Sequence, residues 1–192
     1  MAASAASVFD PKTEAMAAVH RVLGQHPGDD YVNGWAEVWD KCDRDTLPWD
    51  RGSPNPALED LLTEHRSTVG GPTAKDAQGN TYRRKALVPG CGRGVDVLLL
   101  ASFGFDAYGL EYSATALEVC KQEEEKNGNK YPIRDAEVGR GKITFVHGDF
   151  FSNDWLEKLG LSLNCFDLIY DYTVSSFMFL YSIGFVPIQA FP

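Results

Sequence analysis

Apolar and polar positions follow different patterns in the two parts of the chain. Up to about residue 84, helical spacing is interrupted by polar stretches rich in proline and glycine. From Lys85 onwards, short apolar runs alternate with longer segments of helical spacing. The runs predict strands at 85–89, 106–113, 142–151 and 166–173, and the segments between them predict helices at 94–104, 113–128 and 153–160. This alternation is typical of the α/β class, with a mostly parallel sheet covered on both faces.

Three helices and a loop are predicted before the first of these strands. A helix at 11–26 starts at Pro11. Trp35 and Trp39 are four positions apart, so on a helix they share one face. A further helix at 55–65 has Asn55 as its cap and proline at its first position, and 66–84 reads as a loop. We therefore divide the chain into an N-terminal arm (1–30), a ligand-binding domain (31–173) and an apolar tail (174–192).

The turn "PGCGRG" after the first strand predicts a ligand cradle. Gly90, Gly92 and Gly94 leave the backbone bare, and the helix that follows offers free N–H groups to an anionic group. The dinucleotide-binding fingerprint requires a third glycine where this chain has Val95, which disfavours a pyrophosphate. The spacing Gly-x-Gly-x-Gly instead favours S-adenosylmethionine, although a purely structural turn is the alternative.

Polar residues also close the other strands. Glu111 ends the second strand, where a carboxylate can accept hydrogen bonds from ribose hydroxyls. Asp149 ends the third and can accept from an adenine amino group, while Phe150 can cover the purine ring. Asp171 and Tyr172 end the fourth, at the rim where reacting atoms would meet. Parallel strands bring all of these residues to one edge of the sheet.

Composition limits the classes of ligand and the cellular locations that we expect for this chain. The formal charge of −9, from 18 basic and 27 acidic residues, argues against nucleic acid, and Arg83-Arg84-Lys85 is expected to be a solvated strand entry. The four cysteines form no C-x-x-C pair, so we expect no metal site, no disulfide framework and a reduced intracellular setting. No secretory leader is recognisable, and the four histidines form no evident constellation. The expectation is a cytoplasmic monomer with a small-molecule partner and no membrane partner.

Together, the segments "GWAEVWDKCDRDTLPWDRGSPNPAL", "LVPGCGRGVDVLLLASFGFDAYGLEYS" and "FDLIYDYT" resemble the thiopurine S-methyltransferase superfamily over about residues 31–173. The resemblance is closest to its plant and fungal thiol and halide methyltransferases. It implies a Rossmann-like, class I S-adenosylmethionine-dependent methyltransferase fold with the cofactor beneath an aromatic N-terminal lid. It also implies cofactor-binding and catalytic residues. The cofactor-binding residues are Trp35, Trp39, Trp49, Gly90, Cys91, Gly92, Glu111, Asp149, Phe150 and Tyr172, and the catalytic ones are Asp171 and Tyr172.

The implied activity is methyl transfer from S-adenosylmethionine to a small thiol, sulfide or halide. The family pattern would continue beyond the fourth strand, whereas this chain turns into the uncharged run that starts at Val174. We therefore expect the fold to be truncated after the fourth strand, the tail to come from a retained intron or a mispredicted exon boundary, and activity to be impaired. Two alternatives are a short isoform that is non-catalytic or binds the cofactor weakly, and an enzyme that uses another nucleotide cofactor such as NAD.

Overall fold

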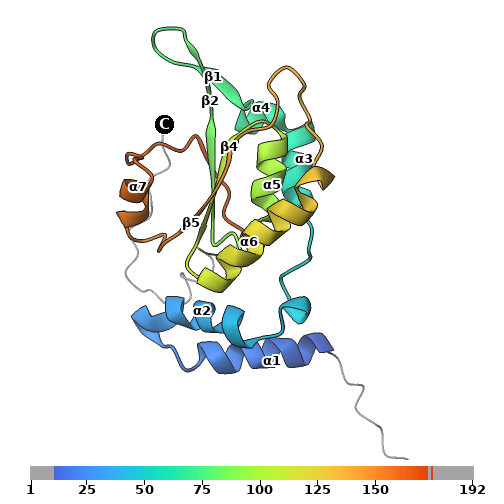
Figure 1. Cartoon of the computed structure of the whole chain (residues 1–192), viewed down its shortest axis with the longest axis vertical. Helices are drawn as coiled ribbons and strands as arrows, with labels where there is room; N and C mark the ends of the chain where they lie inside the picture. Colours follow the sequence, from blue (N-terminus) through green and yellow to red (C-terminus); the bar gives the residue numbers. More distant parts are fainter. Residues whose placement is uncertain (1–10, 173, 175–192) are drawn as a thin grey trace, which may run out of the picture.

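The computed structural model describes residues 11–172 and residue 174 (Figure 1). Its centre is a four-stranded parallel sheet with the order β5-β4-β3-β6. The strands are β3 (Lys85–Pro89), β4 (Asp106–Glu111), β5 (Ile143–His147) and β6 (Leu168–Ile169). All four lie where the sequence predicts strands, so the α/β prediction is confirmed. Apart from Val174, the tail at 174–192 lies outside the described residues.

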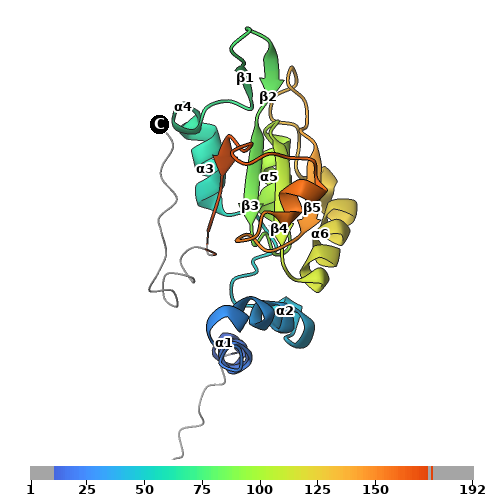
Figure 2. The same cartoon turned by 90° about the vertical axis from the view of Figure 1, so that its left-hand side faces the viewer.

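Helices cover both faces of this sheet (Figures 1 and 2). On one face, Ala86 and Val88 of β3 pack with α5 (Val95–Ser102) and with α3 (Pro56–Glu64). On the other, Leu87 of β3 packs with α7 (Asp154–Lys158). Successive side chains of a strand point to opposite faces, so a strand buried on both sides is apolar throughout. This explains the unbroken run "ALV".

The helix between β4 and β5, α6 (Ala114–Asn127), starts at the Ser113 cap, whose hydroxyl accepts a hydrogen bond from Ala116 N. It is followed by η3 (Gly128–Lys130). The fourth strand is shorter than predicted, with β6 limited to Leu168–Ile169. Just before it, the Asp167 carboxylate accepts from Lys85 N at 2.9 Å, and Asp167 N donates to Lys85 O at 2.9 Å.

The segment predicted as a loop at 66–84 contains regular structure, so that prediction is wrong. It folds into α4 (Arg66–Val69) and a hairpin of β1 (Thr73–Lys75) and β2 (Thr81–Arg83). The Asp76 carboxylate closes the hairpin by accepting from Gln78 N at 2.9 Å and from Asn80 N at 2.8 Å. The hairpin is largely exposed and polar, so no alternation of apolar residues reveals it.

The basic cluster is not a solvated strand entry. Arg83 donates to Gly104 O at 2.5 Å and to Val138 O at 2.6 Å. Arg84 donates to Val69 O at 2.7 Å and to Asp167 O at 2.9 Å. Both guanidinium groups are partly buried, and they tie the amino end of β3 to the surrounding loops.

The N-terminal helices form a separate layer beyond the carboxyl ends of the strands (Figures 1 and 2). This layer, which we call the lid, spans residues 11–50. It contains α1 (Pro11–Leu23), η1 (Gly28–Asp30), α2 (Tyr31–Lys41) and η2 (Arg44–Thr46). Val19 of α1 and Val38 of α2 share an apolar cluster with Ala116 and Val119 of α6. The lid is thus packed onto the body of the domain through α6. None of the described helices combines the length and the apolar character needed to cross a bilayer.

One histidine belongs to a charged cluster that sequence analysis missed. Within the lid, His26 Nδ1 lies 2.5 Å from Asp30 Oδ2, and its Nε2 lies 3.1 Å from Glu37 Oε2. Hydrogen bonds to these two carboxylates raise the pKa of His26 above its ordinary value of 6.5. The imidazole thereby links the turn after α1 to α2.

Candidate functional site

The carboxyl edge of the sheet brings the predicted site residues to one side of the molecule. The glycine turn at 90–94 follows β3, Glu111 ends β4, Asp149 follows β5 and Asp171 follows β6. Parallel pairing places these ends together, and ligands bind at such an edge in open α/β sheets. The lid lies over the same edge (Figure 2).

The glycine turn has a backbone that other residues rarely adopt. Gly90, Gly92 and Gly94 have φ angles of 56°, 54° and 81°. A Cβ added at Gly94 would lie 2.8 Å from the Phe145 ring, and one at Gly92 would lie 3.4 Å from the Trp39 ring. The turn is therefore held between the sheet core and the lid, and its backbone stays bare.

The Glu111 carboxylate organises this turn. One oxygen accepts from Gly92 N at 2.9 Å, and the other accepts from Tyr112 N at 2.8 Å and Ser113 N at 3.0 Å. The residue is only 6% exposed, and this burial raises the pKa of its carboxyl group against the opposing effect of the three N–H donors. Glu111 thus joins the end of β4 directly to the loop after β3.

The three predicted lid tryptophans come together. Trp35 and Trp49 meet edge to face with ring centroids 5.2 Å apart, and Tyr31 meets Trp35 at 6.0 Å. Trp39 is 5% exposed and lies against Gly92. The three tryptophans belong to one apolar cluster, and Trp39 brings this cluster against the glycine turn.

The residues after β5 have structural partners. Asp149 Oδ1 accepts from Phe151 N at 2.9 Å, which forms a tight turn. The Phe150 ring packs partly into the apolar cluster on the α7 face and meets Phe151 edge to face. The structure therefore gives both residues a role in shaping the strand end, beside the predicted contact with adenine.

The residues after β6 form a second tight turn. Asp171 Oδ1 accepts from Val174 N at 2.8 Å, and Tyr172 is 55% exposed. A Cβ added at Gly90 would lie 2.4 Å from Val174 Cγ2, so this turn reaches the glycine turn. Beneath it, burial raises the pKa of Tyr170 to about 12. Asp171 therefore shapes the segment that adjoins the cradle.

Sequence analysis missed four polar residues at this edge. Arg93 and Asp50 form a paired ion contact between the turn and the lid. Tyr112 donates to Asn33 of the lid at 2.7 Å. The first pair could have been suspected from the sequence, because Arg93 lies between two cradle glycines and Asp50 follows a lid tryptophan. Nothing in the local pattern singled out Tyr112 or Asn33, because their contact spans 79 positions.

Two cysteines that are distant in sequence lie beneath the turn. Cys91 Sγ and Cys120 Sγ are 3.7 Å apart, and the Cys120 thiol donates to Gly92 O at 2.8 Å. The neighbouring thiol and burial raise the pKa of Cys91 well above its ordinary value. Both side chains therefore pack beside the turn, and the hydrogen bond from Cys120 braces its backbone.

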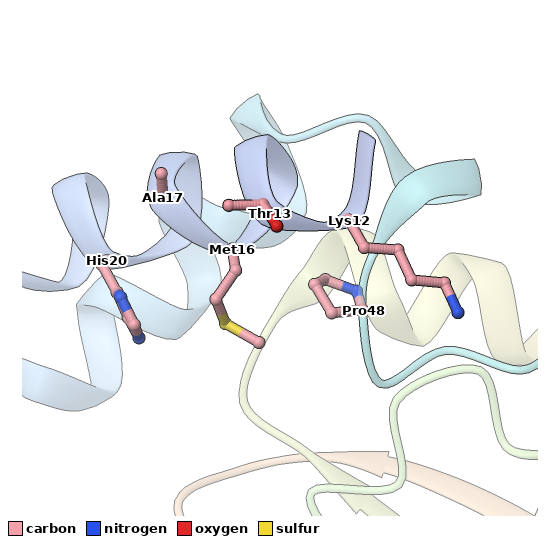
Figure 3. Close-up of a pocket in the computed structure, with 6 residues that line it drawn as sticks. All are labelled: Lys12, Thr13, Met16, Ala17, His20 and Pro48. Atoms are coloured by element: carbon pink, nitrogen blue, oxygen red, sulfur yellow. The ribbon is translucent and has the colours of Figure 1, made fainter. Parts of the chain in front are cut away.

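A hollow lies along α1 (Figure 3). It has a volume of about 530 Å³, and one face of the helix lines it together with Pro48 of the lid. Met16 and His20 point into it, and Lys12 closes one end. None of the predicted cofactor residues lines this hollow, and we assign it no role.

A parallel sheet in the order β5-β4-β3-β6, with a glycine turn after β3 and an acidic residue at the end of β4, defines a Rossmann-like α/β fold. The sequence profile of the family "Thiopurine S-methyltransferase (TPMT)" matches residues 32–176. The chain belongs to this family, and the resemblance inferred from the sequence is confirmed.

Two plant proteins are among the relatives that the chain matches. The chain is 30% identical over 155 residues to "Probable thiol methyltransferase 2" of Arabidopsis thaliana, and the alignment covers 80% of this chain and 51% of the relative. It is 33% identical over 137 residues to "Thiocyanate methyltransferase 1" of Brassica oleracea, with coverage of 71% and 47%. The chain thus spans about half the length of these relatives.

Among solved structures, the fold matches a chain described under "Conversion of a Disulfide Bond into a Thioacetal Group during Echinomycin Biosynthesis". The TM-score is 0.50 at 24% identity, and the match covers 75% of this chain and 47% of the other. At this identity the likeness supports the fold alone.

Proposed function

We propose that this chain binds S-adenosylmethionine at the carboxyl edge of its sheet and serves methyl transfer to a small thiol, sulfide or halide acceptor. The observation that carries the proposal is the hydrogen bond from Gly92 N to Glu111, which unites a bare glycine turn with a buried acid on the neighbouring strand. In this proposal the turn holds the amino-acid end of the cofactor and Glu111 accepts from its ribose, and the hydrogen bond between them supports the two roles.

The residues present fit this cofactor. Glu111 accepts three backbone hydrogen bonds, and a carboxylate offers about four acceptor positions, so capacity for a ribose hydroxyl remains. Gly90 and Gly92 would adjoin the amino-acid end, with Trp35, Trp39 and Trp49 above it. Asp149 and Phe150 would hold the adenine. Val95 argues against NAD, because it begins α5 at the position where the dinucleotide fingerprint has its third glycine.

The bound cofactor would supply an electrophilic methyl group on a sulfonium. Methyl transfer is an in-line displacement, so the chain's own residues chiefly align the reactants and exclude water. A thiolate or halide needs no strong base. Asp171 acts by holding the turn at Val174, and the exposed Tyr172 hydroxyl orients the acceptor. Names of the relatives support thiol-type and thiocyanate acceptors.

Calorimetric titration of the 192-residue chain with S-adenosylhomocysteine and, separately, with NAD tests the cofactor. We expect binding of the first and none of the second. A methyl-transfer assay with hydrogen sulfide, a small thiol, thiocyanate and iodide then tests the acceptor. Binding of NAD alone would refute the proposal, whereas S-adenosylhomocysteine binding without turnover of any acceptor would support the non-catalytic alternative.

A further inference from the structure

The strongest polar contact between lid and body involves no residue predicted to touch the cofactor. Arg93 Nε lies 3.0 Å from Asp50 Oδ1 and 2.8 Å from Asp50 Oδ2, and its Nη2 lies 2.7 Å from Oδ2. The Asp50 side chain is only 7% exposed, and that of Arg93 is 23% exposed. A third group, Glu123 Oε2 of α6, lies 3.9 Å from Arg93 Nη1.

This arrangement differs from the other polar contacts across the same boundary. Tyr112 with Asn33, and Thr115 with Asp40, are exposed hydrogen bonds. The Asp50–Arg93 contact is multidentate, charged and largely shielded from water, and such guanidinium–carboxylate contacts are short, directional and hard to replace. Removing Arg93 would leave the buried Asp50 carboxylate without this counter-charge, and removing Asp50 would take from Arg93 its closest carboxylate. The contact therefore resists opening more than its exposed neighbours do.

Both partners adjoin residues of the proposed cofactor site. Asp50 directly follows Trp49, whose ring packs against Trp35. Arg93 stands between Gly92, which donates to Glu111, and Gly94, which packs against Phe145. An ion pair at this place fixes the lid aromatics relative to the turn.

We propose that Asp50 and Arg93 are positioning residues that latch the lid onto the glycine turn and thereby retain the cofactor. Only the claim that the latch retains the cofactor rests on the proposed function, because the latch itself can be observed without a ligand. Neither side chain is assigned a contact with the methyl group or the acceptor.

Tryptophan fluorescence tests the latch directly. Three of the four tryptophans, Trp35, Trp39 and Trp49, lie in the lid, so a Trp155→Phe background reports on the lid alone. In that background, Asp50→Asn should increase acrylamide quenching in the absence of ligand. The matched control is Asp167→Asn, which makes the same change in a carboxylate paired with Arg84 at the opposite end of β3, and which should leave quenching unchanged.

The affinity for S-adenosylhomocysteine, measured by calorimetry on the same variants, tests cofactor retention. Asp50→Asn should weaken binding about tenfold, within the usual range of coupling between sites, while Asp167→Asn lowers only the melting temperature. Unchanged quenching and affinity in Asp50→Asn would overturn the latch. More quenching with wild-type affinity would overturn its role in cofactor retention.

Failure of the proposed function has a different signature from failure of the latch. If the unsubstituted chain does not bind S-adenosylhomocysteine, the cofactor proposal fails, but quenching still decides whether the latch exists. If Asp50→Asn does not fold by circular dichroism, Arg93→Lys replaces it, because lysine keeps the charge and loses the planar fork. Wild-type quenching in folded Arg93→Lys would then overturn the latch.

Discussion

Glu111 combines a structural and a proposed ligand-binding role in one carboxylate. Its three backbone donors come from Gly92 on the turn after β3 and from Tyr112 and Ser113 at the start of the β4–α6 connection. Substitution must therefore affect both the geometry of the cradle and any ribose contact. An uncharged isostere helps to separate the two effects, because glutamine keeps one oxygen acceptor in the same place.

We predict that Glu111→Ala weakens S-adenosylhomocysteine binding by about 1–3 kcal/mol, because backbone N–H groups and ribose hydroxyls lose their charged acceptor. Glu111→Gln should fall between alanine and the unsubstituted chain. Calorimetry gives the affinities, and circular dichroism confirms that each variant is folded. Unchanged affinity in a folded Glu111→Ala variant would remove Glu111 from the site.

The cradle also predicts which glycine substitutions are costly. At Gly94 the backbone has φ 81° and an added Cβ would lie 2.8 Å from the Phe145 ring, whereas at Gly160 φ is 65° and nothing lies within 4 Å. Gly94→Ala should therefore reduce the free energy of unfolding by about 1–3 kcal/mol more than Gly160→Ala, because overpacking adds to backbone strain. Urea denaturation measures both, and equal losses would contradict this packing.

At the scale of elements, the lid contains a titratable link between α1 and α2. Asp30 and Glu37 raise the pKa of His26, so its contribution is complete below 6.5 and is lost as pH rises through the raised value. Conversely, hydrogen bonds lower the pKa values of Asp30 and Glu37. Their contribution is complete above about 4.5, the higher of the two ordinary values, and falls only as pH drops through the lowered ones.

We therefore predict that the lid is best ordered between about pH 4.5 and 6.5 and loosens as pH rises through the raised pKa of His26. Acrylamide quenching in the Trp155→Phe background, followed from pH 5 to about 9, should increase over this range. His26→Gln should abolish the change, and His20→Gln, which alters a histidine of the neighbouring helix α1, should preserve it. The same pH dependence in His26→Gln would assign it to another group.

The elements differ in how far their sequence predicts them. Apolar runs identify β3 and β4, the Asn55 cap identifies the start of α3, and helical spacing identifies α6, because these signals are local. The hairpin of β1 and β2 was missed because it is polar and exposed, and its turn depends on Asp76. The same distinction holds for the site. Glycine spacing reveals the turn from the sequence, whereas the Asp50–Arg93 pair was missed because it joins residues 43 positions apart.

At the scale of the whole molecule, the proposed site lies at the carboxyl edge of the sheet, and the lid covers this edge. The two parts meet at the Trp39–Gly92 contact and at the Asp50–Arg93 pair. The apolar cluster shared by α1, α2 and α6 joins them as well. Cofactor binding in this arrangement should order both sides of the boundary at once. Membership of the thiopurine S-methyltransferase family rests on residues 32–176, which span this boundary.

Hydrogen–deuterium exchange of the 192-residue chain with and without saturating S-adenosylhomocysteine tests this central claim most directly. The account predicts protection in three segments together: the glycine turn at 90–94, the β4 end at 111–113 and the lid at 31–50. The hairpin at 73–83, which lies at the other end of the sheet (Figure 1), should exchange equally in both samples. Protection confined to α1 or the hairpin, with none at 90–94 and 111–113, would contradict the proposed site.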